Sequence, residues 1–271
     1  MDRRRGGNGG AFDWGFNGVM TDRVKSLLLA MEFGTILPMP HMDGVNQDTL
    51  SRSMGFFPVT GLALGLILWG FMWTGTHFLT EDATAILGLG VYVLATGALH
   101  LDGLSDTFDA FGSRRPPKEA LAVMKDSRIG TMGAAALAIV LIGKAVAFAK
   151  MPVSGPGPWV VVPVLARTSV VWCMAWSSPA RPDGLGALYS RRLSYKTVGG
   201  VTVVSLALAA WLLPWYQALI AVMLCMMATV IWVFLTRRRF GGATGDTYGA
   251  LLELVEWVGF LVLAGGWGYG R

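Results

Sequence analysis

Seven long apolar runs constrain the fold of this chain more than any other feature. Each is close to the roughly 20 residues that a helix needs to cross about 30 Å of hydrocarbon, and 54% of the 271 residues are hydrophobic while 14% are charged. The pattern predicts an all-α, polytopic membrane protein with about seven transmembrane helices. Six are expected instead if the fifth run, which ends at Pro214, merges with the sixth or re-enters the protein. The runs lie at 55–79, 83–100, 131–150, 158–176, 197–213, 215–235 and 248–268.

Basic residues gather in alternate connections between these runs. The N-terminal head and the segments 101–130, 177–196 and 236–247 carry most of the Lys and Arg, whereas the other connections are short and nearly free of them. The positive-inside rule therefore predicts a multi-pass protein of the cytoplasmic (inner) membrane, with its N-terminus and these three polar loops in the cytoplasm. The net charge of +5 fits this topology together with an anion site. Outside these loops the chain has no basic stripe with interleaved aromatics, which is the pattern that would indicate nucleic-acid binding.

The N-terminal head differs in composition from the rest of the chain. Residues 1–22 are rich in Gly and Arg, which predicts disorder, and residues 23–271 are expected to form a single transmembrane catalytic domain. The segment 24–38 is too short to span a bilayer, so we expect it to lie in the membrane interface or to re-enter the protein.

Three aspartates follow the second apolar run at helical spacing. Asp102, Asp106 and Asp109 stand at i, i+4 and i+7, so one face of a helix would carry all three carboxylates. A divalent cation relieves their mutual repulsion, and Mg²⁺ bound by carboxylates usually also holds substrate phosphates. The spacing therefore predicts a magnesium site whose substrate carries phosphate, at the polar, cytoplasmic end of the helices. His100, two residues before Asp102, is expected either beside this site or in no functional role.

A basic group follows the aspartates. Lys125 and Arg128 are three residues apart, and on a shared face they would make a phosphate clamp, with Arg as a bidentate fork. The alternative is that both simply anchor the loop at the membrane surface. The turn-rich segment 177–192, with Arg181 and Arg191, is predicted to be a binding loop.

A second polar constellation precedes and enters the last apolar run. Asp246, Glu253 and Glu256 fall on one helical stripe, and charged residues inside a span mark a functional interior by default. The two glutamates would complete a metal site, bind a polar substrate group, or close contacts between helices. Lys144 and Arg167, in two other spans, would either neutralise them or contact substrate.

From the residues alone, the chain is expected to be a magnesium-dependent phosphoryl or pyrophosphate transferase with a site open to the cytoplasm. The motifs also resemble the cobalamin synthase family, whose reaction is adenosylcobinamide-GDP ribazole transfer. The pieces that carry the resemblance appear in the family's order: Phe33 to Pro40, Ser51-Arg52 with Phe57, Pro58 and Gly61, His100 to Asp109, Lys125 to Gly130 with Gly133, Arg167, Gly184 to Gly186, and Gly241 to Gly249 with Glu253 and Glu256.

The resemblance implies transfer of the phosphocobinamide group of adenosylcobinamide-GDP to α-ribazole or its 5′-phosphate, with release of GMP, in the last assembly step of coenzyme B12. The Mg²⁺ predicted from the aspartate spacing fits this reaction as its cofactor. Self-association, or association with other late enzymes of that pathway, is left open. The expected metal ligands are Asp102, Asp106, Asp109 and Asp246. The expected catalytic residues are Asp102, Asp106, Lys125, Arg128 and Asp246, the last as ligand or general base. The expected substrate-binding residues are Arg52, Arg114, Arg167, Arg181, Arg191, Glu253 and Glu256.

Other functions are less consistent with the sequence. CDP-alcohol phosphotransferases and ubiquinone-type prenyltransferases also place aspartates at cytoplasmic helix ends, but this chain lacks the longer Asp-Gly-x-x-Ala-Arg run of the first and the Asn-Asp-x-x-Asp motif of the second. An ion-coupled transporter would also carry charges inside its spans, but no matching pair of broken helices indicates inverted repeats.

Overall fold

The computed structural model describes residues 21–265 except 41, 43, 182–183 and 191–192, and every regular element in that part of the chain is helical. The predicted disordered head, residues 1–22, lies outside it except for the last two residues. The twelve α-helices and one short 3₁₀ helix are α1 Asp22–Gly34, α2 Gln47–Ser53, η1 Met54–Phe56, α3 Phe57–Gly75, α4 Glu81–Thr96, α5 Leu99–Gly112, α6 Pro117–Val123, α7 Thr131–Lys150, α8 Gly157–Trp176, α9 Leu185–Ser190, α10 Tyr195–Leu212, α11 Trp215–Phe240 and α12 Gly245–Ala264.

The prediction of a polytopic helical membrane protein is confirmed. Within the described residues, six helical segments are long and apolar enough to span a membrane, and a seventh is added if α4 and α5 count as one bent span. The choice between six and seven was predicted to depend on residues 197–235, and this was wrong. There α10 and α11 are separate helices that meet at Leu213 and Pro214.

The bend between α4 and α5 is the largest departure from the predicted topology. The two helices meet at 89°, because Gly97 and Ala98 both adopt left-handed backbone, with φ of 61° and 57°. A break inside a membrane protein leaves backbone groups that need partners. The N–H of Ile36, in the segment after α1, donates to the carbonyl of Ala95 at 2.9 Å. The expected span at 83–100 is therefore a 16-residue helix followed by a second helix in a new direction.

Helix α8 forms the centre of the bundle. Every residue from Gly157 through Met174 is buried, and α3, α10, α11 and α12 all pack against it. Small residues allow the closest of these approaches: a Cβ at Gly61 would lie 2.5 Å from the carbonyl oxygen of Pro163, and one at Gly65 would lie 2.6 Å from that of Trp159. Gly61-x-x-x-Gly65 thus lets the backbones of α3 and α8 meet, as small residues do between membrane helices.

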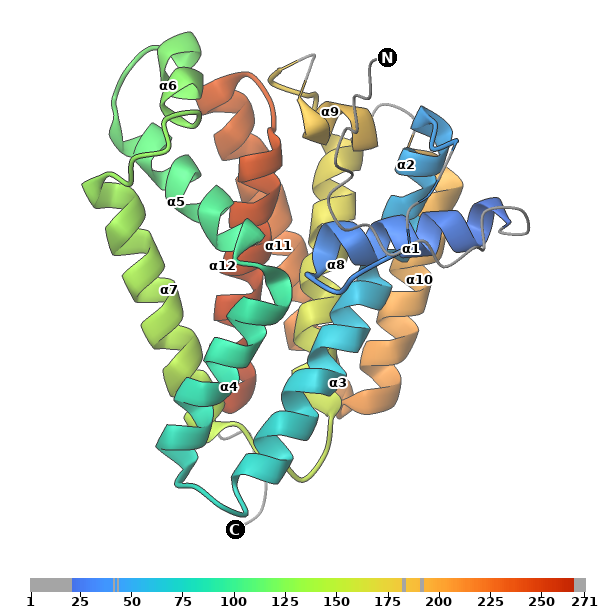
Figure 1. Cartoon of the computed structure of the whole chain (residues 1–271), viewed down its shortest axis with the longest axis vertical. Helices are drawn as coiled ribbons and strands as arrows, with labels where there is room; N and C mark the ends of the chain where they lie inside the picture. Colours follow the sequence, from blue (N-terminus) through green and yellow to red (C-terminus); the bar gives the residue numbers. More distant parts are fainter. Residues whose placement is uncertain (1–20, 41, 43, 182–183, 191–192, 266–271) are drawn as a thin grey trace, which may run out of the picture.

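The connections divide between the two ends of the bundle (Figure 1). The links α3–α4, α7–α8 and α10–α11 lie at the lower end of the view, whereas α2, α6 and α9 lie at the upper end with the start of α12. Helix α1 lies across the bundle below α2 and α9 in this view (Figure 1). The three polar loops of the sequence thus meet at one end, which we call the loop end.

Candidate active site

Helix α5 presents the three aspartates as the sequence predicts, since Asp102, Asp106 and Asp109 all fall within it. The bend at Gly97 directs α5 away from the line of α4, across α12 and toward α7. Its close packing on α12 requires glycine: a Cβ at Gly103 would lie 2.8 Å from the backbone oxygen of Asp246. This contact brings the residue next to Asp102 against the first turn of α12.

Asp246 lies at the start of α12, which local hydrogen bonds stabilise. Thr244 and Thr247 form a capping box, in which the Thr244 N–H donates to the Thr247 hydroxyl oxygen at 2.7 Å and the Thr247 N–H donates to the Thr244 hydroxyl oxygen at 3.2 Å. The half-buried Asp246 therefore lies in the first helical turn, where the helix dipole favours a carboxylate.

The 177–181 segment pairs with the residues that lead into α12. The N–H of Ala243 donates to the Ser178 carbonyl at 2.9 Å, and the N–H of Ala180 donates to the Ala243 carbonyl at 2.8 Å. A Cβ at Gly242 would collide with that Ser178 carbonyl, so only glycine fits there. The pairing brings the guanidinium of Arg181 to 4.0 Å from the Asp246 carboxylate.

Asp102, Asp106 and Asp246 make up what we call the acidic cluster. The Asp106 carboxylate interacts electrostatically with Asp102, Asp246 and Asp109, and with Arg181 as the opposite charge. Among the described residues, no three His, Cys, Asp or Glu side chains converge as a ready-made metal site. Mg²⁺ usually takes one or two protein carboxylates and fills its other positions with water and substrate phosphate. The oxygen donors of the acidic cluster fit that chemistry.

Asp109 has a different position from the other two aspartates of α5. Its carboxylate accepts hydrogen bonds from the N–H of Gly130 at 2.7 Å and from the N–H of Gly133 at 2.8 Å. These are backbone groups at the start of α7, where the first N–H groups of a helix lack partners within it. Asp109 therefore joins α5 to α7, and its predicted role as a metal ligand stays a prediction.

The predicted phosphate clamp is not helical. The helix that precedes its residues, α6, begins at Pro117 and ends at Val123, and Lys125 and Arg128 follow in irregular backbone. The prediction that the two residues share one face of a helix is therefore wrong. Both side chains are exposed, and Arg128 pairs with Asp126 at 2.7 Å. That guanidinium lowers the pKa of Asp126 to about 2. A phosphate contact by Lys125 or Arg128 stays a prediction.

The four arginines predicted in the loops lie in different places. Arg181 joins the acidic cluster, whereas Arg52 is exposed in α2 and lies 3.8 Å from Asp22. Arg114 is exposed in the turn after α5, with φ of 53°, and Arg191 lies outside the described residues. Substrate contacts by Arg52, Arg114 and Arg191 stay predictions.

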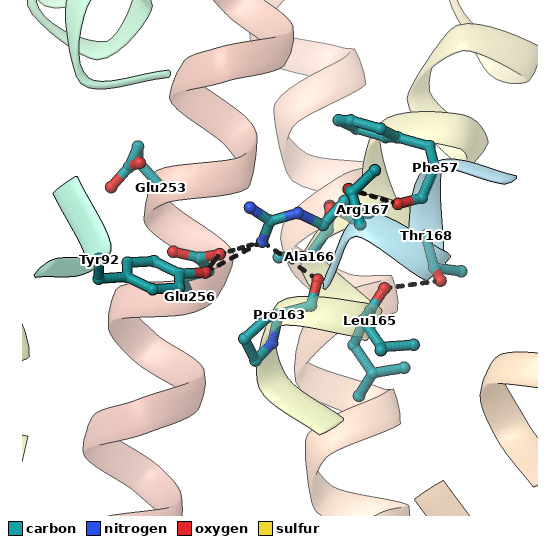
Figure 2. A network of polar contacts seen from close by, with 12 residues as sticks. Phe57, Tyr92, Pro163, Leu165, Ala166, Arg167, Thr168, Glu253 and Glu256 are labelled. Carbon is teal, nitrogen blue, oxygen red and sulfur yellow. Dashed lines mark hydrogen bonds and ion pairs between the residues drawn. The ribbon is translucent and has the colours of Figure 1, made fainter. Parts of the chain in front are cut away.

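Charged residues inside the bundle form a paired cluster, which we call the buried ion network. The ammonium group of Lys144 lies 2.7 Å from Glu253 and 2.6 Å from Glu256, and Glu256 also pairs with Arg167. Figure 2 shows the Arg167 guanidinium directed from α8 toward Glu256 on α12 and the hydroxyl of Tyr92 on α4. Tyr92 donates to Glu256 at 2.5 Å.

The network is almost fully buried, since none of its four charged side chains is more than 4% exposed. Its cations thus neutralise the two glutamates, which is one of the two roles that the sequence left open. Substrate binding by Arg167, Glu253 and Glu256 stays a prediction. Sequence reasoning missed Tyr92, because a tyrosine within an apolar run carries no signal of a charged partner.

The chain matches the protein family described as Cobalamin-5-phosphate synthase over residues 26–264. This chain belongs to that family. The match runs from α1 to the end of α12, so it includes the acidic cluster and the buried ion network. As a member of the cobalamin-5-phosphate synthase family, the chain is a membrane-spanning transferase of cobalamin synthesis.

Curated relatives cover almost the same length. The adenosylcobinamide-GDP ribazoletransferase of Brevibacillus brevis is 35% identical over 246 residues, which is 90% of this chain and 99% of that protein. The proteins of the same name from Roseiflexus sp. and Pseudomonas putida are 38% and 36% identical, over 86% and 88% of this chain and 87% and 97% of their own lengths. No solved structure matches this chain.

Proposed function

We propose that this protein transfers the phosphocobinamide group of adenosylcobinamide-GDP to α-ribazole or α-ribazole 5′-phosphate in a magnesium-dependent reaction. The single observation that carries the proposal is the acidic cluster, in which α5 and α12 bring Asp102, Asp106 and Asp246 together beside Arg181 at the loop end. The names of the relatives supply the donor and the ribazole acceptor.

The bond changes define what the site must do. A hydroxyl oxygen of the acceptor forms a bond to the cobinamide-side phosphorus, the phosphoanhydride bond to the guanosine phosphate breaks, and GMP leaves with the bonding electron pair. The hydroxyl proton passes to a carboxylate or to water. Negative charge gathers on the bridging and non-bridging phosphate oxygens, so groups that neutralise it accelerate the reaction.

The residues of the loop end are assigned roles on this basis. One or two of the carboxylates of Asp102, Asp106 and Asp246 would hold Mg²⁺, which when bound would neutralise phosphate charge and polarise the phosphoryl group. Asp246 is the alternative acceptor of the hydroxyl proton. Arg181 is suited to a bidentate contact with a phosphate, and Lys125 and Arg128 lie in the exposed loop that follows α6 and are assigned to the developing charge.

We also propose that the loop end faces the cytoplasm and that the membrane is the inner membrane. The basic side chains of the α5–α6 connection, Arg181 and the last turn of α11 belong to that end, whereas the links α3–α4 and α10–α11 at the other end carry no Lys or Arg. This distribution follows the positive-inside rule. In this proposed orientation the acidic cluster would lie on the side where soluble nucleotides are made.

A turnover assay tests the proposal. Purified protein in lipid or detergent should convert adenosylcobinamide-GDP and α-ribazole into a cobalamin product and release GMP. Chelation of Mg²⁺ should stop the reaction, and added Mg²⁺ should restore it. CDP-alcohols and prenyl diphosphates should not act as donors. Release of CMP or pyrophosphate from those donors, with no use of the cobinamide, would contradict the proposal.

A further inference from the structure

A cavity with several aromatic side chains in its wall lies directly beside the acidic cluster. Its wall combines residues of α1, α3, α5, α8, α9 and α12, and it includes Asp102 and Asp246. We call it the aromatic pocket. Its volume of about 120 Å³ is of the order that holds one aromatic ring. A molecule inside the pocket would thus lie against the acidic cluster.

The aromatic side chains of the pocket are arranged around Phe33. Its ring centroid lies 4.9 Å from that of Tyr189, 5.6 Å from that of Phe57 and 6.5 Å from that of His100. These separations are typical of tilted and edge contacts, the geometries in which a further flat ring also packs well. The pocket wall therefore favours an aromatic ligand.

Besides the Tyr248 hydroxyl, which also lacks a partner among the described residues, His100 is the unpartnered polar group of this wall. It is 4% exposed, and within the described residues neither ring nitrogen has a hydrogen-bond partner. A buried donor or acceptor left unpaired costs about 1–3 kcal/mol, so a side chain in this position calls for a partner that the protein itself does not supply. A neutral imidazole offers one N–H donor and one acceptor, and a ligand nitrogen can take the donor.

We propose that the aromatic pocket binds the heteroaromatic base of the acceptor nucleoside, with the His100 N–H donating to the unprotonated ring nitrogen of that base. This rests on the proposed function. One ring of the base lies among Phe33, Phe57 and Tyr189, and the ribose extends toward Asp102 and Asp246, where its hydroxyl meets the donor. His100 is a binding residue in this arrangement and stays outside the bond changes.

The donor also carries an aromatic base, but guanine fits the pocket less well. Guanine has an amide, an exocyclic amine and ring nitrogens, and each polar group that is buried without a partner reduces affinity. A benzimidazole-like base has one unprotonated ring nitrogen and otherwise apolar edges. The unpartnered polar groups of the pocket are the imidazole of His100 and the hydroxyl of Tyr248, and apart from Asp102 and Asp246 its other side chains are aromatic or aliphatic. This lining is closer to the second pattern.

The test changes the protein and the ligand in turn, as in a double-mutant cycle. Binding is measured by calorimetry with purified wild-type protein and with His100→Phe. The ligands are α-ribazole and its indole analogue, in which a C–H replaces the unprotonated ring nitrogen. Wild type should bind the analogue about tenfold more weakly than α-ribazole. His100→Phe should bind α-ribazole about tenfold more weakly than wild type does, and should bind the two ligands equally. GDP should bind both proteins equally.

Controls keep the outcomes distinct. His77→Phe, at the opposite end of the bundle, should leave all affinities unchanged. The comparison of the two ligands on wild type needs no variant, so a folding defect in His100→Phe does not decide the result. Equal binding of α-ribazole and its analogue by wild type overturns this inference, as does an equal loss of GDP affinity in His100→Phe. Failure of GMP release from adenosylcobinamide-GDP by wild type instead overturns the proposed function.

Discussion

Replacing Lys144 with methionine tests whether the buried ion network stabilises the bundle. Lys144 is 2% exposed and its ammonium group contacts both Glu253 and Glu256. The formal charges of these three residues and Arg167 sum to zero, so Lys144→Met leaves one buried carboxylate without a cation. Removal of one partner of a buried pair costs about 3–5 kcal/mol. We expect a decrease of that size in the free energy of unfolding.

A second substitution should restore the charge balance. Lys144→Met/Glu253→Gln removes one charge of each sign and retains the pair between Arg167 and Glu256. Because neutral replacement of a whole buried pair is often close to neutral in stability, the double variant should be more stable than Lys144→Met by about 2 kcal/mol. The control is Lys150→Met, at the exposed end of the same helix, which should change the free energy of unfolding by less than about 0.5 kcal/mol.

Unfolding in mixed micelles with increasing SDS, followed by circular dichroism, measures these differences, and donor binding is measured in parallel. If Lys144→Met unfolds at the same SDS fraction as Lys150→Met, or if the double variant is no more stable than the single one, the network does not stabilise the fold. A stable double variant that has lost affinity for adenosylcobinamide-GDP would support the alternative role of Glu253 in substrate binding.

Three further predictions follow from single contacts. Gly242→Ala should lose about 1–3 kcal/mol of stability and much of the turnover, because its Cβ would push the Ser178 carbonyl and Arg181 away from α12. The control is Gly199→Ala, where a Cβ meets open space, and an equal effect there would refute this prediction. Asp109→Ala should cost about 1–3 kcal/mol in thermal or SDS unfolding and Asp109→Asn less, since Asn keeps one acceptor for the start of α7; equal losses would contradict the capping role. A cysteine at Ser113 should resist a membrane-impermeant reagent added outside intact cells while one at His77 reacts, and the reverse pattern would invert the orientation.

The long helices could be predicted from the sequence because hydropathy depends on local composition, and local composition determines which segments are apolar enough to enter a membrane. The bend between α4 and α5 could not, because Gly97 and Ala98 are as apolar as their neighbours and no proline marks the break. A backbone hydrogen bond at the bend comes from Ile36, about 60 residues earlier in the chain. The periodicity of a sequence reports only the spacing of residues that are close in the chain. It therefore could not predict a bend that involves packing between distant segments.

In the candidate site, too, the features set by local spacing could be predicted, and those set by contacts between distant segments could not. The spacing of Asp102, Asp106 and Asp109 predicted their common helix, but Asp109 turned to the start of α7 because two backbone N–H groups there need an acceptor. Lys125 and Arg128 were predicted to share a helical face, but they follow the end of α6 at Val123 in irregular backbone. Partners that come from a different helix, such as Tyr92 for Glu256, leave no pattern in a single sequence.

The most direct test of the central claim is magnesium-dependent GMP release by Asp106→Asn compared with Asp82→Asn, which changes an exposed aspartate at the start of α4. Asn keeps the shape of Asp106 and removes a hard anionic ligand of the acidic cluster. We predict that Asp106→Asn inserts and purifies as wild type does but releases GMP about 100-fold or more slowly at saturating Mg²⁺, whereas Asp82→Asn is unchanged. Turnover by Asp106→Asn near that of wild type would contradict the assignment of the acidic cluster as the place where the diphosphate reacts.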